Sequence, residues 1–170
     1  MKFKIPSALH TTRIDTPLGS VRLAATDAGL AGMWFDGQQH SPDTRGWQDN
    51  ALHPVLRQAA EQLLAYFEGR RDGFDLPLDL SHGTAFQQSV WQALLAIPRG
   101  ETTSYGALGR RVGRPAAVRA VGAAVGRNPI SVIVPCHRVV GADGSLTGYA
   151  GGLARKTALL ALEGARGAGA

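Results

Sequence analysis

The sequence has a single cysteine among its 170 residues, and this scarcity excludes two ways of holding a small protein together. One cysteine cannot form an intramolecular disulfide, and it cannot supply a set of thiolate ligands for structural zinc. Long apolar runs are also missing, since no stretch approaches the roughly 18 apolar residues of a membrane-spanning helix. The opening residues lack the apolar core of a signal peptide. We therefore expect a soluble, cytoplasmic protein with no membrane partner.

Acidic residues are scarce in the second half of the chain. Residues 1–85 carry 8 Lys and Arg against 10 Asp and Glu, whereas residues 86–170 carry 10 against 3. No acidic residue occurs between Glu101 and Asp143, an interval that contains six arginines. Such a basic surface is typical of proteins that bind a polyanion such as DNA, but it also occurs as a solvated surface that keeps a protein soluble. The charge counts leave both interpretations open.

The first half has the pattern of a small sheet followed by a helix. Three segments of mostly alternating apolar and polar residues, "LHTTRIDT", "SVRLAATD" and "LAGMWFD", predict an antiparallel strand series. The segment "HPVLRQAAEQLLAYFEGR" predicts a helix that stops near Gly69. Its predicted apolar face contains Leu56, Ala59, Ala60, Leu63 and Phe67. We therefore predict an N-terminal α/β domain over residues 1–82, a small antiparallel sheet plus a helix, in which His10, His40 and His53 are ordinary surface histidines.

The second half changes to helical spacing. "TAFQQSVWQALLAI" predicts one helix, "SYGALGRRVG" a second with Ser104 as its N-cap, and "RPAAVRAVGAAVG" a third with Pro115 in its first turn. The last two form a helix-turn-helix candidate. "ISVIVP" then predicts a buried strand, and "LARKTALLALEG" a final helix with the apolar stripe Leu153, Ala158, Leu159 and Leu162. We predict a mostly α C-terminal domain over residues 83–170.

The third of these helices is poor in side chains that could identify a DNA sequence. Sequence readout needs Arg, Asn or Gln at base edges in the major groove, whereas this helix is built largely from Ala, Val and Gly. Small residues such as Ala117, Ala120 and Gly122 allow close approach to a DNA backbone or minor groove, with phosphate contacts from nearby arginines, Arg138 among them. The alternative is that these alanines pack into the core.

Cys136 lies beside His137 in "VPCHRVVG", which raises the question of whether the thiol is a nucleophile. A free thiol is only a few per cent ionised at neutral pH and needs a base or a positive potential. Direct contact between neighbours is awkward, so a water molecule is the expected relay from Cys136 to His137. An imidazole in this role usually has a carboxylate partner, and Glu163 is a candidate. The alternative is a buried, unreactive cysteine.

Two segments, "NPISVIVPCHRVVGADGSLTGYAGGLARKTALLALEG" and "FQQSVWQALLAIPRGETTSYGALGRRVG", closely resemble the signature of the O6-alkylguanine-DNA alkyltransferases, the methylated-DNA–protein-cysteine methyltransferases. The resemblance covers essentially the whole second half, and the first half resembles the family's N-terminal domain more weakly. It implies an α/β domain followed by a helical domain that binds duplex DNA through a helix-turn-helix in the minor groove. It also implies direct-reversal repair, in which an alkyl group moves irreversibly from guanine O6, and from thymine O4 as an additional substrate, to a cysteine in a single turnover.

The resemblance also implies roles for particular residues. Cys136 would accept the alkyl group, His137 would deprotonate it through a water, and Glu163 would orient His137. Asn128 would brace the turn. Tyr105 would help rotate the nucleotide and stabilise the departing guanine, and Arg119 would fill the vacated stack. The base pocket would be lined by Tyr149, Ala150 and the backbone of Val139.

The same resemblance implies a monomer that acts on double-stranded DNA containing O6-alkylguanine, without a cofactor. Some relatives bind zinc through N-terminal cysteines that this chain lacks, so no metal is expected. Ala150 occupies a position where some relatives carry Ser, which leaves the range of alkyl groups open. Two rival functions remain: a sensor that binds alkylated DNA without reacting, and a cysteine hydrolase using Cys136 and His137.

Overall fold

The computed structural model describes residues 9–165 and divides the chain into two compact units. The first unit runs to His82 and also includes Pro129–Ser131, and the second consists of Gly83–Asn128 and the chain from Val132 onward. Within residues 9–165, no helix combines the length and the apolar character that crossing a membrane requires.

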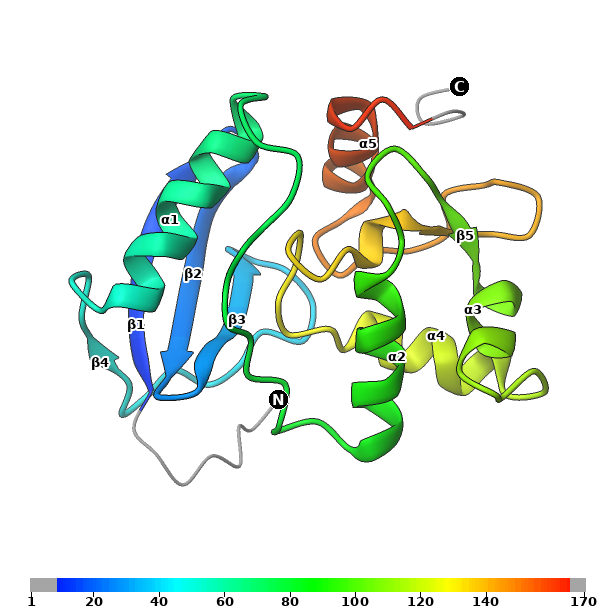
Figure 1. The fold of residues 1–170 in the computed structure, drawn as a ribbon, viewed down its shortest axis with the longest axis horizontal. Coiled ribbons are helices and arrows are strands. Elements are labelled where there is room, and N and C mark those ends of the chain that lie inside the picture. Colours follow the sequence, from blue (N-terminus) through cyan, green and yellow to red (C-terminus); the bar gives the residue numbers. More distant parts are fainter. Residues whose placement is uncertain (1–8, 166–170) are drawn as a thin grey trace. The chain divides into compact units, whose positions relative to one another are not determined.

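The first unit is built on a four-stranded sheet (Figure 1), which contains the predicted antiparallel strands and one further short strand that was not predicted. Its strands are β1 (His10–Thr16), β2 (Gly19–Thr26), β3 (Gly29–Phe35) and β4 (Gln48–Asp49), in the order β3-β2-β1-β4. The strand pairs β1–β2 and β2–β3 are antiparallel, and the short β4 is parallel to β1. A two-residue turn joins β1 to β2, where Gly19 supplies a positive φ of 117°.

Helix α1 (Pro54–Phe67) packs on this sheet (Figure 1). Pro54 stands at the first position, where its missing N–H costs no hydrogen bond, and the His53 side chain caps the helix by accepting from the Val55 N–H. The helix ends before Gly69, whose φ is 75°, as predicted. Its buried face is Leu56, Ala59, Leu63 and Tyr66. The prediction was wrong at the end of this face, where Tyr66 is fully buried and Phe67 only half-buried.

Strand β3 is buried along its whole length because later segments of the chain cover its free edge. The Leu30 N–H donates to the Pro77 carbonyl at 2.8 Å, and the Met33 N–H donates to the Pro129 carbonyl at 2.8 Å. Ile130 forms an isolated parallel bridge with Met33. An edge strand this apolar would otherwise expose unpaired backbone groups.

The second unit is mostly helical, as predicted (Figure 1). Its helices are α2 (Ala85–Leu95), α3 (Tyr105–Arg111), α4 (Val118–Gly126) and α5 (Leu153–Leu162). A capping box formed by Thr84 and Gln87 starts α2, and the predicted Ser104 N-cap starts α3. The Trp91 indole N–H donates to the Ala124 carbonyl at 2.9 Å and so ties α2 to α4. Pro115 lies in the turn before α4, so its predicted place in the first helical turn was wrong.

The predicted strand "ISVIVP" does not form. Val132 adopts a positive φ of 70°, and the chain runs through turns into the short 3₁₀ helix η1 (Cys136–Arg138). The burial inferred from this apolar run is confirmed, since every residue from 128 to 140 is buried. Beyond η1, strand β6 (Val139–Val140) pairs in parallel with β5 (Thr103–Ser104).

Candidate active site

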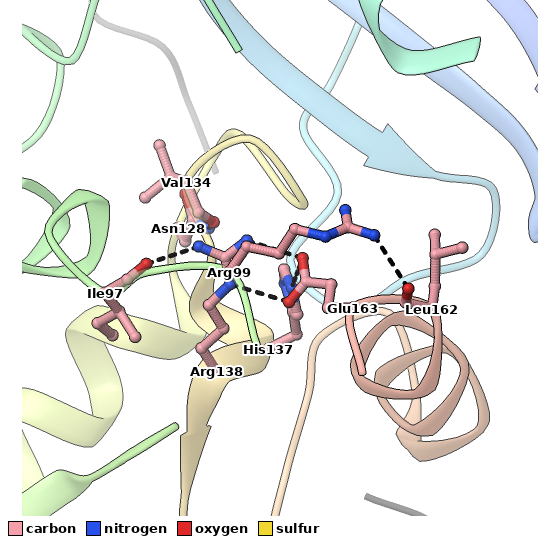
Figure 2. Close-up of polar contacts among 8 residues, drawn as sticks. All are labelled: Ile97, Arg99, Asn128, Val134, His137, Arg138, Leu162 and Glu163. Carbon is pink, nitrogen blue, oxygen red and sulfur yellow. Dashed lines mark hydrogen bonds and ion pairs between the residues drawn. The ribbon is translucent and has the colours of Figure 1, made fainter. Parts of the chain in front are cut away.

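Cys136 begins η1 at the end of a tight turn. The Val134 carbonyl accepts a hydrogen bond at 2.8 Å from the Asn128 side-chain amide (Figure 2). It also accepts one at 2.8 Å from the Cys136 backbone N–H. Asn128 is therefore hydrogen-bonded to the loop that it was predicted to brace. Because Pro135 has no N–H and a fixed φ, the chain reaches the cysteine with little conformational freedom.

The Cys136 residue is buried and only 5% exposed. Burial raises the pKa of the Cys136 thiol to about 11, while hydrogen bonding from Asn128 and the positive charge of Lys156 act in the opposite direction. The resting cysteine is therefore a thiol, and a nucleophilic thiolate requires a base.

The base candidate His137 is paired with Glu163, as the sequence predicted. His137 Nε2 lies 3.0 Å from Glu163 Oε2, and both side chains are completely buried (Figure 2). Burial lowers the pKa of His137, and the Glu163 carboxylate partly counteracts this. A neutral imidazole that donates from Nε2 to a carboxylate has its lone pair on Nδ1. His137 Nδ1 is buried and makes no hydrogen bond to another described residue, so it is available to accept a proton.

Glu163 is shared between His137 and Arg138. Arg138 donates from Nε to Glu163 Oε1 at 2.9 Å and from its NH2 nitrogen to Oε2 at 2.7 Å, and its NH1 nitrogen donates to the Ile97 carbonyl at 2.6 Å (Figure 2). The Arg138 residue is only 8% exposed. Because its guanidinium is committed to these internal partners, the predicted role of Arg138 in DNA binding is not retained.

The residues expected to line the base pocket come from the segment after η1. The rings of His137 and Tyr149 meet edge to face, with their centroids 6.4 Å apart. Val139 is fully buried in β6, and Ala150 is half-buried in the loop before α5. Tyr149 and Val139 therefore lie in the immediate surroundings of the Cys136–Arg138 turn.

Apart from Arg138, the predicted DNA-contacting residues lie on α4 or at its N-cap. Arg119 and Ala120 are exposed, Ala117 is half-buried, and a Cβ added at Gly122 would lie 3.8 Å from the Tyr105 ring. Ala117 and Ala120 line a shallow hollow of about 300 Å³ together with Phe86 and Arg114. Phe86 was not among the predicted DNA-contacting residues.

Sequence reasoning missed one buried cation beside the cysteine. The predicted apolar stripe of the last helix was partly wrong: Leu153 is 47% exposed, whereas Lys156 is fully buried with Leu159 and Leu160. The available signal was a lysine flanked by apolar residues at helical spacing. Among residues 9–165, no cluster of three or more His, Cys, Asp or Glu side chains could hold a metal ion.

Both units of the chain are similar to known proteins. Residues 85–165 match the family model described as "6-O-methylguanine DNA methyltransferase, DNA binding domain", and residues 9–80 match its "ribonuclease-like domain". The methylated-DNA–protein-cysteine methyltransferase of Mycolicibacterium paratuberculosis is 50% identical over 150 residues, which is 88% of this chain and 89% of the relative. The enzyme of the same name from Methanosarcina barkeri is 48% identical over 151 residues, covering 88% and 94%. The crystal structure of Mycobacterium tuberculosis OGT in complex with DNA superposes with a TM-score of 0.84 at 48% identity, covering 91% of this chain and 92% of that one.

Proposed function

The chain belongs to the 6-O-methylguanine DNA methyltransferase family, and on this premise we propose that it repairs DNA by moving the alkyl group of O6-alkylguanine to Cys136. The observation that carries the proposal is that His137, which directly follows the only cysteine of the chain, is paired in the interior with Glu163. The histidine Nδ1 is left as a proton acceptor. This arrangement can turn a thiol into a nucleophile without a cofactor.

In the proposed reaction, the Cys136 proton passes through a bridging water to His137 Nδ1. The Sγ thiolate then attacks the alkyl carbon in line with the O6–carbon bond, so that a carbon–sulfur bond forms as the carbon–oxygen bond breaks. The departing guanine anion is neutralised by the proton that left the thiol. Glu163 holds the imidazole in the required tautomer and stabilises its charged form during the transfer. The Tyr105 hydroxyl assists the leaving base.

The proposed product implies that each molecule acts once. A thioether at Cys136 has no labile bond that water or His137 could cleave under mild conditions, so the thiol is not regenerated. The protein is therefore consumed in proportion to the lesions that it repairs.

The target carbon is attached at a base edge, so the base must leave the duplex to meet a buried thiol. Extrusion costs a few kcal/mol of unstacking, and an arginine inserted into the vacated space offsets part of it. Arg119, exposed on α4 among small residues, fits this role, and α4 can approach the minor groove closely. We extend the substrate range to O4-alkylthymine, whose alkyl group is also attached to an exocyclic oxygen.

We also propose that the protein acts as a monomer on duplex DNA in the cytoplasm. The basic second half supplies a sequence-independent attraction for phosphates, which suits a protein that must inspect any sequence.

The test is stoichiometric incubation with a duplex containing O6-methylguanine, followed by peptide mass mapping. We expect the peptide with Cys136 to gain the mass of one methylene group, and no gain with an unmodified duplex or in a Cys136→Ser variant. An unmodified cysteine peptide would refute alkyl transfer. If that protein still bound the damaged duplex, the alternative of a non-reacting sensor would replace the proposal.

A further inference from the structure

Helix α5 ends directly before Glu163, the partner of His137. The last carbonyls of a helix have no donor within the helix and must find partners elsewhere. In α5, three of the last four accept from the backbone N–H groups of residues 163–165. The fourth is the carbonyl of Leu162, and its partner comes from a distant segment of the chain.

Arg99 supplies this partner. Its NH2 nitrogen donates to the Leu162 carbonyl at 3.0 Å, and the side chain extends to it from the loop after α2 (Figure 2). This carbonyl belongs to the peptide group that leads into Glu163, so the bond restrains the plane to which Glu163 is attached. Helix α5 has no basic residue in its own last turn. A cation at this end offsets the unfavourable position of the Glu163 carboxylate beside the negative pole of the helix.

A tight turn directs Arg99 to this position. The Glu101 N–H donates to the Pro98 carbonyl at 3.1 Å, which makes Arg99 the second residue of the turn and Gly100 the third. The φ of Gly100 is 83°. A type II turn requires such a positive φ at its third residue, and glycine adopts it without strain. The backbone of Arg99 is therefore restrained on both sides.

Two further contacts join residues 97–100 to the end of α5. Arg138, which is paired with Glu163, also donates from its NH1 nitrogen to the Ile97 carbonyl at 2.6 Å (Figure 2). A Cβ added at Gly100 would lie 3.2 Å from the Glu163 carbonyl oxygen. Residues 97–100 therefore contact the backbone at Glu163 as well as the ion pair formed by its side chain.

The position of the Glu163 carboxylate decides how His137 behaves. Burial lowers the pKa of His137, and the hydrogen bond and the charge of Glu163 oppose this effect. The hydrogen bond joins His137 Nε2 to Glu163 Oε2 at 3.0 Å. Such a bond weakens steeply when its length or angle departs from the optimum. A shift of the backbone at Glu163 would therefore change both the basicity of His137 and its preferred tautomer.

We propose that Arg99 is a positioning residue for alkyl transfer: it holds the Leu162 carbonyl, and through the adjoining peptide group it keeps the Glu163 carboxylate aligned with His137 Nε2. The inference rests on the proposed function, because this alignment affects the reaction only if His137 is the base for Cys136. The alignment itself does not depend on DNA or on an alkylated substrate, so it can be measured without either.

The primary test compares Arg99→Met with Arg155→Met. Arg155 is half-buried like Arg99 and donates from its NH1 nitrogen to the Gly151 carbonyl at 3.0 Å, at the other end of α5. The control therefore loses the same kind of bond. Nitrogen-15 NMR at neutral pH reports the tautomer of His137, whose signals are assigned by their loss in His137→Gln. We expect Arg99→Met to populate the second tautomer and to speed exchange of the Nε2 proton with water about tenfold, because a loosened buried hydrogen bond opens more often.

Single-turnover rates with the free base O6-benzylguanine are measured in parallel at saturation, so that altered DNA binding has no effect. We expect Arg99→Met to react about tenfold more slowly, which is part of the contribution of a well-placed base, and Arg155→Met to match the wild type in rate and in His137 signals. Both variants should lose similar stability towards urea, which distinguishes positioning from a general loss of stability. Unchanged His137 signals in folded Arg99→Met would overturn the proposal, and so would equal changes in Arg155→Met.

If Arg99→Met does not fold, Gly100→Ala decides. This variant retains the Arg99 side chain but disfavours the positive φ of the turn, and it places a Cβ close to the Glu163 carbonyl oxygen. We expect the second His137 tautomer and faster exchange of the Nε2 proton here as well. His137 signals identical to those of the wild type would overturn the proposal.

The two proposals fail in different ways. If the wild type does not transfer an alkyl group but Arg99→Met still changes the tautomer of His137, the proposed function is wrong and the positioning of Glu163 stands. If the wild type transfers an alkyl group and the His137 signals do not depend on Arg99, only the role of Arg99 is wrong.

Discussion

At the scale of single residues, Glu163 connects the reaction chemistry to stability. Its carboxylate accepts from His137 Nε2 and from two nitrogens of Arg138, all in the interior. One acidic side chain therefore sets the histidine tautomer and also neutralises a buried guanidinium. Removal of a partner from a buried ion pair is far more costly than removal of an exposed one.

Glu163→Gln should therefore damage both properties. We expect the free energy of unfolding to fall by about 3 kcal/mol, because Arg138 is left without its counter-charge, and the rate of alkyl transfer to fall about 100-fold, because His137 loses its orienting carboxylate. Urea denaturation and single-turnover kinetics measure the two effects. The exposed Glu101→Gln serves as the control and should change neither. A fully active Glu163→Gln would show that His137 does not depend on this partner.

The lowered pKa of His82 predicts how the free energy of unfolding depends on pH. Burial lowers its pKa to about 4, and the nearby Asp79 charge acts in the opposite direction. An unfolded histidine has a pKa near 6.5, so below about pH 6.5 the unfolded chain binds the proton first, and the folded state loses stability down to about pH 4. His82→Gln cannot titrate and should flatten part of the decline in unfolding free energy between pH 7 and 5, measured by urea denaturation. The remaining decline belongs to His137, whose pKa is also lowered by burial. An equal slope in the variant and the wild type would contradict this assignment.

At the scale of secondary-structure elements, α3 and α4 differ in their N-caps and in their side-chain composition. Helix α3 has a side-chain N-cap and ends in two arginines, whereas α4 has no side-chain cap and consists of Val, Ala and Gly with Arg119 as its one long polar side chain. Small residues on α4 leave room beside the Tyr105 ring and expose a smooth face. Such a face favours close approach to DNA over base-specific readout.

Arg119→Ala should separate base extrusion from chemistry. We expect repair of an O6-methylguanine duplex to slow at least about tenfold, because nothing fills the vacated stack, while the reaction with free O6-benzylguanine stays near the wild-type rate. Single-turnover rates with both substrates are measured together with those of Arg111→Ala, which removes the same charge from an exposed site on α3. Equal losses on duplex and free base would exclude a role for Arg119 in extrusion.

At the scale of the whole molecule, charge is divided unevenly along the chain. Residues 86–170 carry 10 basic and 3 acidic residues, whereas residues 1–85 carry slightly more acidic than basic ones. The residues that carry the proposed chemistry all belong to the second unit. An excess of positive charge in this unit concentrates it along DNA without selecting a sequence.

Binding to undamaged duplex should therefore weaken steeply with salt. Each phosphate neutralised by Lys or Arg contributes about −0.9 to the slope of log K against log salt, so several arginine contacts give a slope of about −3 or steeper. Fluorescence anisotropy with a labelled duplex between 50 and 200 mM salt measures this slope. A nearly flat dependence would show that the basic residues do not contact phosphates.

Local sequence was sufficient for features that depend on neighbours along the chain. The alternating strands, the Ser104 N-cap and the stop at Gly69 follow from local propensity, and the resemblance to a known family led to the pairing of His137 with Glu163. Tertiary packing decided the rest. Arg138 was expected on the surface, yet it lies inside with a carboxylate 25 residues away, and "ISVIVP" turns at Val132 where a strand was expected. Lys156 looked like any helical lysine, and only the fold placed the Val139 and Gly148 carbonyls around its Nζ. The physical reason is that the burial of a charge, and therefore its pKa and its partners, depends on segments that are distant in the chain and come together only when it folds.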